Sequence, residues 1–321
     1  MIDILERKFG KSPLMAVGFG DDISAVKLDD GRRVLVLKTD MLVGSTDIPP
    51  GMTVRQAARK ALVANVSDMA AKGVRPLAGL VALGLPAHLT EHDVNGVADG
   101  LGEAARECRF PLVGGDTNES KDLIISIALF GIAKANQLVR RSGARVGDVI
   151  VVTGEFGSTT AGLKALIENK QRPHQLPRQL FEAVFYPKAQ LELGLRLAAS
   201  GALTSSIDSS DGLAWSLHEL AKASRVGVRI DRVPVSRAAL KFAADFGYDA
   251  NELAFYGGEE YHIVATVKPD RVKSIKQKTH GKMRVIGAVT SRSSGVVFRH
   301  NGGDIKIARK GWEHFKRQNH H

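Results

Sequence analysis

The stretch Thr53–Gly73, TVRQAARKALVANVSDMAAKG, decides the fold that we predict. Thr53 is a suitable N-cap, alanine is frequent in the interior, and Gly73 is a typical stop signal, so the pattern predicts a helix over residues 53–72. The segment RVLVLKTD, residues 33–40, predicts a buried strand before this helix, and residues 77–85 predict a strand after it. The order strand, helix, strand indicates a domain in which helices pack on a sheet.

The rest of the first half continues this alternation. Residues 90–108 predict a second helix with Thr90 as its N-cap, and residues 123–133 predict a strong strand. Between them, residues 111–113 predict a short strand that runs into a Gly-Gly-Asp turn. Residues 135–147, ANQLVRRSGARVG, are polar and basic, as expected of a connection between domains.

The second half has the same mixed character. We predict helices near residues 187–200 and 212–225, and strands at residues 148–153, 226–230, 261–267 and 283–288. The fold class is therefore α/β or α+β, with one domain over residues 1–135 and a second, α/β sandwich domain over residues 136–321.

Composition limits the class of protein. The chain has 321 residues, of which 44% are hydrophobic and 25% are charged, as is ordinary for a soluble globular protein. Its single cysteine, Cys108, excludes a disulfide framework within the chain and argues against a thiolate metal site, so we expect a cytoplasmic protein. The N-terminal MIDILERKFG lacks a signal-peptide core, and the longest apolar stretch, residues 77–87, is too short to span a membrane.

The formal net charge is +11, and the basic excess is concentrated in residues 271–282 and 306–317. Such an excess is compatible with a nucleic-acid binder or with a solvated basic face on an enzyme whose substrates are anionic. We favour the second interpretation, because no aromatic residues are interleaved with the basic ones for base stacking.

Short acidic motifs recur along the chain, mostly where an apolar run stops and a loop or helix starts. They are Gly20-Asp21-Asp22, Lys38-Thr39-Asp40, Asn65-Val66-Ser67-Asp68, Gly114-Gly115-Asp116 and Asp208-Ser209-Ser210-Asp211-Gly212. Each alone has a plainer interpretation as a turn or a helix cap. Together they predict carboxylates that converge and repel one another unless cations lie between them, and Mg²⁺ with a polyphosphate is the natural filler. The set indicates a metal-dependent phosphoryl-transfer enzyme.

Read in order, these motifs resemble the thiamine-monophosphate kinase family, within the superfamily of aminoimidazole ribonucleotide synthetase and selenophosphate synthetase. The resemblance runs through GFGDD, KTDML, NVSDMAAKGVRP, LVGGDT, RRSGARVGD, IDSSDGL, YGGEEYH and GWEHF. It implies ATP-dependent phosphorylation of thiamine monophosphate to thiamine diphosphate with several Mg²⁺ ions. It also implies a homodimer in which the N-terminal sheets pair into a barrel.

The resemblance further implies roles for individual residues. The implied metal positions are Asp22, Lys38, Thr39, Asp40, Asp68, Asp116, Asp208 and Asp211. The implied nucleotide contacts are Gly115, Asp116, Arg141 and Ser210, and the implied catalytic residues are Asp68, Asp116 and Arg141. The acceptor end would be held by Asp47, Glu259, Glu260 and Trp312, whose ring can stack on a cationic thiazolium.

Two positions depart from the resemblance. The family often has serine where Lys38 stands, and lysine could replace a metal ion with its own charge. It often has histidine where Asp47 stands, and an anionic side chain beside an incoming phosphate needs a metal or a different pose. The alternatives left open are another ATP-dependent synthetase of the superfamily with a different acceptor, and a non-catalytic binder of nucleotide or nucleic acid.

Overall fold

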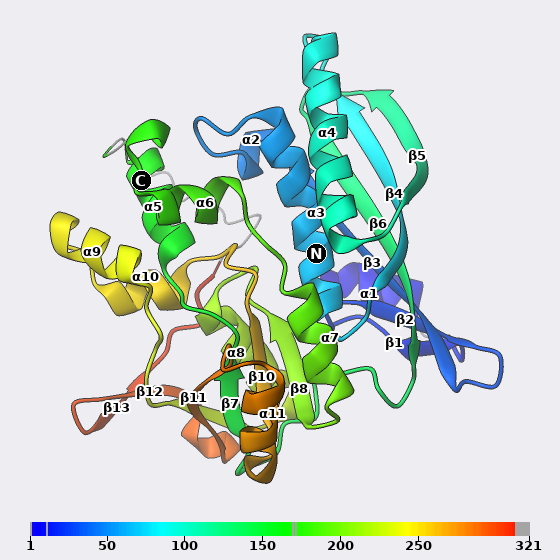
Figure 1. The fold of residues 1–321 in the computed structure, drawn as a ribbon. Coiled ribbons are helices and arrows are strands. Elements are labelled where there is room, and N and C mark those ends of the chain that lie inside the picture. The colour runs from blue at the N-terminus through cyan, green and yellow to red at the C-terminus, as the bar shows by residue number, and fades with distance from the viewer. Residues whose placement is uncertain (1, 11, 169, 171, 312–321) are drawn as a thin grey trace.

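The computed structural model describes residues 2–10, 12–168, 170 and 172–311. Its N-terminal half is built on a six-stranded mixed sheet (Figure 1). The strand order is β1-β2-β3-β6-β4-β5, and only the β4–β5 pair is parallel. In chain order the elements are α1 Ile2–Phe9, β1 Met15–Val17, β2 Ser24–Leu28, β3 Arg33–Val43, α2 Gly44–Asp47, α3 Val54–Ala71, β4 Pro76–Leu85, α4 Glu91–Cys108, β5 Leu112–Glu119 and β6 Ile124–Lys134.

The two long helices of this half, α3 and α4, cover one face of the sheet. Helices α3 and α4 pack together there, and Val97 and Leu101 of α4 share a core with Val34, Val36 and the alternate apolar residues of β6. The opposite face stays open in the single chain and carries exposed apolar side chains from several strands, namely Met41, Leu77, Leu80, Val113 and Ile132.

The C-terminal half contains a seven-stranded sheet of order β13-β12-β9-β11-β7-β10-β8, in which β12 and β9 are parallel. Its strands are β7 Val149–Val152, β8 Leu203–Asp208, β9 Gly227–Ile230, β10 Ile263–Val267, β11 Arg284–Thr290, β12 Val296–His300 and β13 Gly303–Lys306. Its helices are α5 Ser158–Ile167, α6 Arg178–Phe185, α7 Leu191–Ala199, α8 Leu213–Ser224, α9 Arg237–Phe246, α10 Ala250–Tyr256 and α11 Val272–Lys278, with short 3₁₀ turns at Pro173–Gln175, Pro269–Arg271 and Arg292–Ser294.

Both faces of the second sheet are covered. Leu213 and Leu217 of α8 pack with Ile150 and Val152 on one face, and Leu197 of α7 packs with strand residues on the other. The molecule is thus a two-domain mixed α/β protein, as its sequence predicts. The domain limits, residues 1–135 and 136–321, stay a prediction.

Helix α3 lies between the two halves and is buried almost all round, including many of its polar residues. On one side it packs against β3, β6 and α4, and on the other it contacts α7 and β8. The contact with α7 is so close that a Cβ on Gly194 would lie 2.0 Å from the carbonyl oxygen of Ala70. Glycine at 194 is therefore required for the two helices to meet.

Several sequence predictions are confirmed by these elements. Thr53 caps α3 through a capping box with Gln56, Gly73 has a φ of +71° just beyond the helix, and Thr90 caps α4. The segment before Asp211 is a strand, and a helix follows it. Among the described residues no helix is long and apolar enough to cross a membrane.

Two acidic motifs do not lie at strand ends, contrary to the prediction. Strand β3 continues past Asp40 to Val43, and β5 runs straight through Gly114-Gly115-Asp116 to Glu119. The second case has a physical reason. A Cβ on Gly115 would lie 1.7 Å from the carbonyl oxygen of Val81, so glycine here allows β5 to approach β4 closely instead of making a turn.

Candidate active site

A cluster of buried and half-buried carboxylates lies where the C-terminal part of α3 meets β3 and the end of β8. Its first pair is held by a lysine. The Lys38 Nζ atom lies 2.9 Å from Asp40 Oδ2 and 2.6 Å from Asp68 Oδ2, and the Lys38 side chain is only 11% exposed. Asn65, one helical turn before Asp68, accepts a hydrogen bond from the Asp40 backbone N–H at 2.9 Å. Strand and helix are thus fixed together at this pair.

A second pair of acids is held by a second lysine. The fully buried Lys72 Nζ lies 2.7 Å from Asp21 Oδ1 and 2.8 Å from Asp22 Oδ2, and it donates a 2.5 Å hydrogen bond to the Ser206 carbonyl oxygen of β8. Arg141 joins the same group. Its Nη2 pairs with Asp22 and its backbone N–H donates to Asp21 Oδ2 at 2.9 Å. We call Asp21, Asp22, Asp40 and Asp68 the lysine-paired acids.

The turn after β8 supplies two further carboxylates, Asp208 and Asp211, which we call the lysine-free acids. Asp208 accepts hydrogen bonds from the Ser67 Oγ of α3 at 2.6 Å and from the Ser210 Oγ at 2.9 Å. Within the described residues, neither Asp208 nor Asp211 forms an ion pair. Gly212, with a φ of +106°, turns the chain into α8 directly after them.

Burial raises pKa values in both groups, including that of Asp68, whose pKa lies well above its usual value although Lys38 opposes the shift. Burial, reinforced by nearby carboxylates, raises the pKa of Asp208 to about 6 and that of Asp211 to about 7. Burial would also raise the pKa of Asp22, but Lys72 and Arg141 outweigh it, and the pKa lies below its usual value. The lysine-free acids therefore lie in a field that favours binding of a cation or a proton.

The chemistry of this cluster fits a hard divalent ion. Its ligand atoms are carboxylate and hydroxyl oxygens, which Mg²⁺ prefers. Across the described residues, no three Asp, Glu, His or Cys side chains come together as a ready-made metal cage. Mg²⁺ usually takes one or two protein carboxylates and completes its shell with water and substrate phosphates.

Two of the predicted acceptor residues, Asp47 and Glu259, contact Lys60 of α3, and we call these three residues the Lys60 arm. The Lys60 Nζ, 5% exposed, donates to the Asp47 carbonyl oxygen at 2.8 Å and pairs with Glu259. The Asp47 carboxylate itself accepts the Val43 backbone N–H at 2.8 Å, so it is bound locally within its own turn. The buried Lys60 therefore lies beside the turn of Asp47, where it contacts the backbone carbonyl and not the carboxylate.

Glu260 has a different environment from Glu259. Its carboxylate is buried and accepts the backbone N–H of Gly157 at 2.7 Å and of Thr159 at 3.2 Å, which caps the start of α5. Burial raises the pKa of Glu260 to about 7 despite these hydrogen bonds. Of the two acids, Glu259 is the one that contacts the Lys60 arm. Trp312 lies outside the described residues.

Three predicted residues lie away from this cluster. Side chains alternate along a strand, so Thr39 points to the face of the first sheet opposite Lys38 and Asp40. Asp116 lies on the same open face, because it pairs in register with Ala82, next to Ser126 and Met41. Gly115, at the contact with Val81, also lies on the edge strand β5. The single chain does not bring these residues to the acids.

Sequence reasoning missed three charged residues of the site, Lys60, Lys72 and Glu219, and it named Asp21 only within the Gly20-Asp21-Asp22 motif. Glu219 receives both Arg141, at 3.1 Å, and Arg309, at 2.7 Å. A signal for Lys72 was present, because Asn65, Asp68 and Lys72 are spaced i, i+3, i+7 and share one helix face. Lys60 is a charged residue in an alanine-rich helix, and this is a weaker indication of a role in the site.

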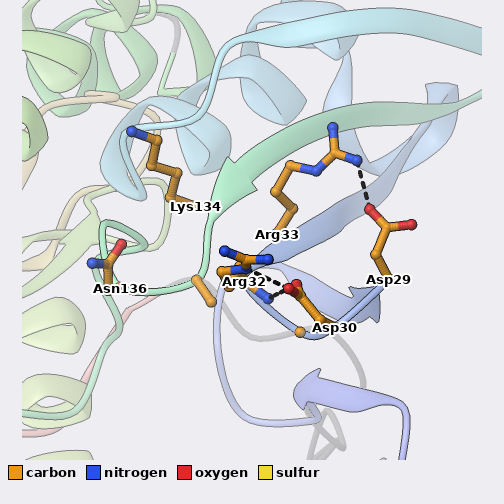
Figure 2. Close-up of a pocket in the computed structure, with 8 residues that line it drawn as sticks. Asp29, Asp30, Arg32, Arg33, Lys134 and Asn136 are labelled. Atoms are coloured by element: carbon orange, nitrogen blue, oxygen red, sulfur yellow. Dashed lines mark hydrogen bonds and ion pairs between the residues drawn. The ribbon is translucent and has the colours of Figure 1, made fainter.

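The pocket at the hairpin between β2 and β3 is separate from this cluster (Figure 2). No predicted site residue lines it. Arg32 pairs with Asp30, and Arg33 with Asp29, so most of its charges are balanced.

Comparisons with known proteins show the family to which both halves of the chain are similar. The family models "AIR synthase related protein, N-terminal domain" and "AIR synthase related protein, C-terminal domain" match residues 20–133 and 145–300. The solved structure "AaThiL complexed with AMPPCP and TMP" superimposes with a TM-score of 0.83 at 28% identity, over 98% of this chain and 96% of that one.

Alignments with named relatives cover almost the whole chain. The thiamine-monophosphate kinase of Pyrococcus abyssi is 34% identical over 92% of this chain and 90% of its own length. That of Nitrosopumilus maritimus is 37% identical over 98% of this chain and 97% of its own length. On this likeness, the chain belongs to the thiamine-monophosphate kinase family.

Proposed function

We propose that this protein transfers the γ-phosphoryl group of ATP to thiamine monophosphate and releases thiamine diphosphate and ADP. The observation that carries the proposal is the carboxylate cluster at the junction of the two halves, in a chain that belongs to the thiamine-monophosphate kinase family. The complex of a structural relative with AMPPCP, an ATP analogue, and TMP supports the same pair of substrates.

The donor end is proposed to lie at the acid cluster. The lysine-free acids Asp208 and Asp211 would be the residues best placed to hold Mg²⁺, which would supply positive charge against the nucleotide phosphates. Arg141 is held by Asp22 and Glu219, and its side chain is 16% exposed, so its charge has a fixed position. We propose that Arg141 and Ser210 contact the nucleotide phosphates.

The acceptor end is proposed to lie at the Lys60 arm. Lys60 can exchange its contact with Glu259 for the phosphate of thiamine monophosphate, since both are anions and the lysine is already positioned. Glu259 and Asp47 would border this phosphate, while Glu260 holds the loop by capping α5. Trp312 stays our proposal for the contact with the thiamine rings.

The chemistry needs no protein nucleophile. An oxygen of the acceptor phosphate is anionic near neutral pH and can attack the γ-phosphorus directly, while the bond to the bridging β-oxygen breaks and ADP leaves. The obstacles are repulsion between two polyanions and misalignment. Cations at both ends address the first obstacle, and the fixed junction of the two halves addresses the second. We therefore propose direct in-line transfer without a phosphoenzyme.

We also propose a homodimer that buries the open face of the N-terminal sheet. The face carries exposed apolar side chains, among them Met41 at 62%, Val113 at 61% and Leu77 at 54%. A face of this kind is typical of a protein interface. Thr39 and Asp116 lie on it, so pairing of two such sheets into a barrel would enclose both. Sedimentation analysis of the protein and of the variant L77K tests this; a monomeric native protein would contradict it.

The function is tested by an assay with Mg²⁺, ATP and thiamine monophosphate, in which the thiamine products are separated by chromatography. We expect thiamine diphosphate and ADP in equal amounts. Folded protein that binds ATP but forms no thiamine diphosphate would favour another acceptor within the superfamily. Salt-sensitive binding of nucleic acid without ATP turnover would favour a non-catalytic binder.

The single cysteine, Cys108, supports the cytoplasmic location that the sequence predicts.

A further inference from the structure

The ammonium group of Lys38 occupies the space between two carboxylates that the sequence predicts as metal ligands. It lies within 2.9 Å of an oxygen of Asp40 and within 2.6 Å of an oxygen of Asp68. Both carboxylates use one of their oxygens on this single cation. A divalent ion that bridged the same two oxygens would have to share the space with the ammonium or displace it.

Displacement is opposed by the surroundings of the lysine. The Lys38 side chain is 11% exposed and projects from β3 on the face that α3 covers, and Asp68 is itself 8% exposed. Asn65 fixes the backbone of Asp40 against α3, so the two carboxylates cannot move apart without loosening that contact. Asp40 is 45% exposed, so the contact of Lys38 with Asp68 is the more enclosed of the two.

The second lysine of the cluster follows the same plan. Lys72 is fully buried, contacts Asp21 and Asp22, and is anchored by the Ser206 carbonyl oxygen. Two lysines and Arg141 therefore balance much of the charge of the six acids, and the uncompensated charge remains at the turn of Asp208 and Asp211. The distribution of charge is uneven within one site.

We propose that Lys38 is a built-in cation that takes the place of one divalent ion between Asp40 and Asp68. The site then binds one Mg²⁺ fewer than it would with serine at position 38, and metal binding is concentrated at Asp208 and Asp211. This inference rests on the proposed function only in that the metal site serves a nucleotide. The pairing of Lys38 with two carboxylates is a property of the chain by itself.

The test counts bound Mn²⁺, a spectroscopic substitute for Mg²⁺, by electron paramagnetic resonance of the free ion. Native protein and the variant K38S are titrated with Mn²⁺ alone and with Mn²⁺ plus saturating AMPPCP. We expect K38S to bind one more Mn²⁺ per chain than the native protein in the presence of AMPPCP. Without nucleotide, we expect it to bind Mn²⁺ at least about tenfold more tightly, since two carboxylates lose their cation.

Three variants control the comparison. K134S removes the same charge from β6, at the pocket near the β2–β3 hairpin, and should leave the Mn²⁺ count unchanged. K38R keeps a cation in place and should also leave it unchanged. K38S/D40N removes one charge of each sign and should gain no ion. If K38S folds poorly on its own, its melting temperature should rise with added Mn²⁺ far more than that of the native protein.

Each result decides between defined outcomes. Equal Mn²⁺ counts and affinities for native protein and K38S, with AMPPCP bound in both, would overturn the inference and leave the proposed function standing. Failure of the native protein to bind AMPPCP would count against the proposed function, and the titration with Mn²⁺ alone would still decide the role of Lys38. An equal gain of Mn²⁺ in K134S would also overturn the inference.

Discussion

The lysine-paired acids and the lysine-free acids lie in one cluster but have opposite electrostatic environments. Asp22, Asp40 and Asp68 have partner cations from the chain itself, whereas Asp208 accepts hydrogen bonds from the hydroxyl groups of Ser67 and Ser210, and Asp211 has no ion pair among the described residues. Lys38, Lys72 and Arg141 compensate most of the negative charge of the first group without any ligand. Burial raises the pKa values of the second group, as it does that of Asp68, and we propose that an external cation binds at the second group. We therefore expect that substitutions at the turn after β8 change metal and nucleotide binding more than substitutions of the lysine-paired acids do.

The largest expected effect comes from neutralising a lysine-free acid. The variant D211N should lower kcat/KM about 10²–10³-fold, the loss found when one electrostatic contact to the reacting phosphates is removed. Its melting temperature should change little or rise, because the carboxylate it removes is crowded by Asp208, Asp40 and Asp22. Steady-state kinetics and calorimetry check both parts. Full activity in D211N would contradict the proposal that the lysine-free acids hold the metal ion.

The next effect concerns a lysine-paired acid and should appear in stability. The variant D68N leaves Lys38 with Asp40 alone, and removing one partner of a buried pair costs roughly 3–5 kcal/mol, here towards the low end. D40N is the matched control, since it keeps the closer contact of Lys38 with Asp68, and Asp40 is 45% exposed. Urea unfolding measures the two losses. A loss in D40N as large as in D68N would show that burial does not separate the two acids.

The third effect tests the acceptor arm against the donor cluster. The variant K60M should raise KM for thiamine monophosphate about 10–100-fold, the worth of one hydrogen bond to a charged group, with a much smaller effect on KM for ATP. E259Q keeps the lysine and should change both values less. Initial-rate kinetics with each substrate varied in turn provide the measurement. Equal changes in the two KM values would contradict the proposal that ATP and thiamine monophosphate bind at separate ends of the site.

The last effect is a pH dependence of stability that comes from the lysine-free acids. The pKa of Asp211 is about 7 in the folded protein, above its unfolded value, so the folded state binds more protons between about pH 4 and pH 7. Without metal, stability should therefore fall as pH rises through this range. D211N should show a shallower fall, and added Mg²⁺ should reduce it too. Thermal melts of metal-free protein at several pH values check the sign.

Local sequence was sufficient to predict the elements that carry the site. The caps of α3 at Thr53 and of α4 at Thr90 depend on neighbours within one turn, so the motif alone locates them. The turn after β8 was equally local. Asp116 was misplaced because the strand around it is set by the close approach of Gly115 to Val81, more than thirty residues away in the chain.

The partners of the site residues could not be predicted in the same way. Lys72 meets Asp22, and Ser67 meets Asp208, only because α3 packs between two sheets. A spacing pattern shows that Asn65, Asp68 and Lys72 share a face, but it does not show what lies opposite. The departures at Lys38 and Asp47 were visible in the sequence, and the structure supplies their partners.

The burial of α3 on all sides has a consequence for folding cooperativity. Ala71, near its end, belongs to the core beneath the second sheet, while Leu191 and Tyr261 from the second half belong to the core of the first. Each half therefore completes the interior of the other. We expect a single calorimetric transition for the whole chain, and we expect residues 1–135 expressed alone to stay unfolded until the remaining segment is supplied in trans.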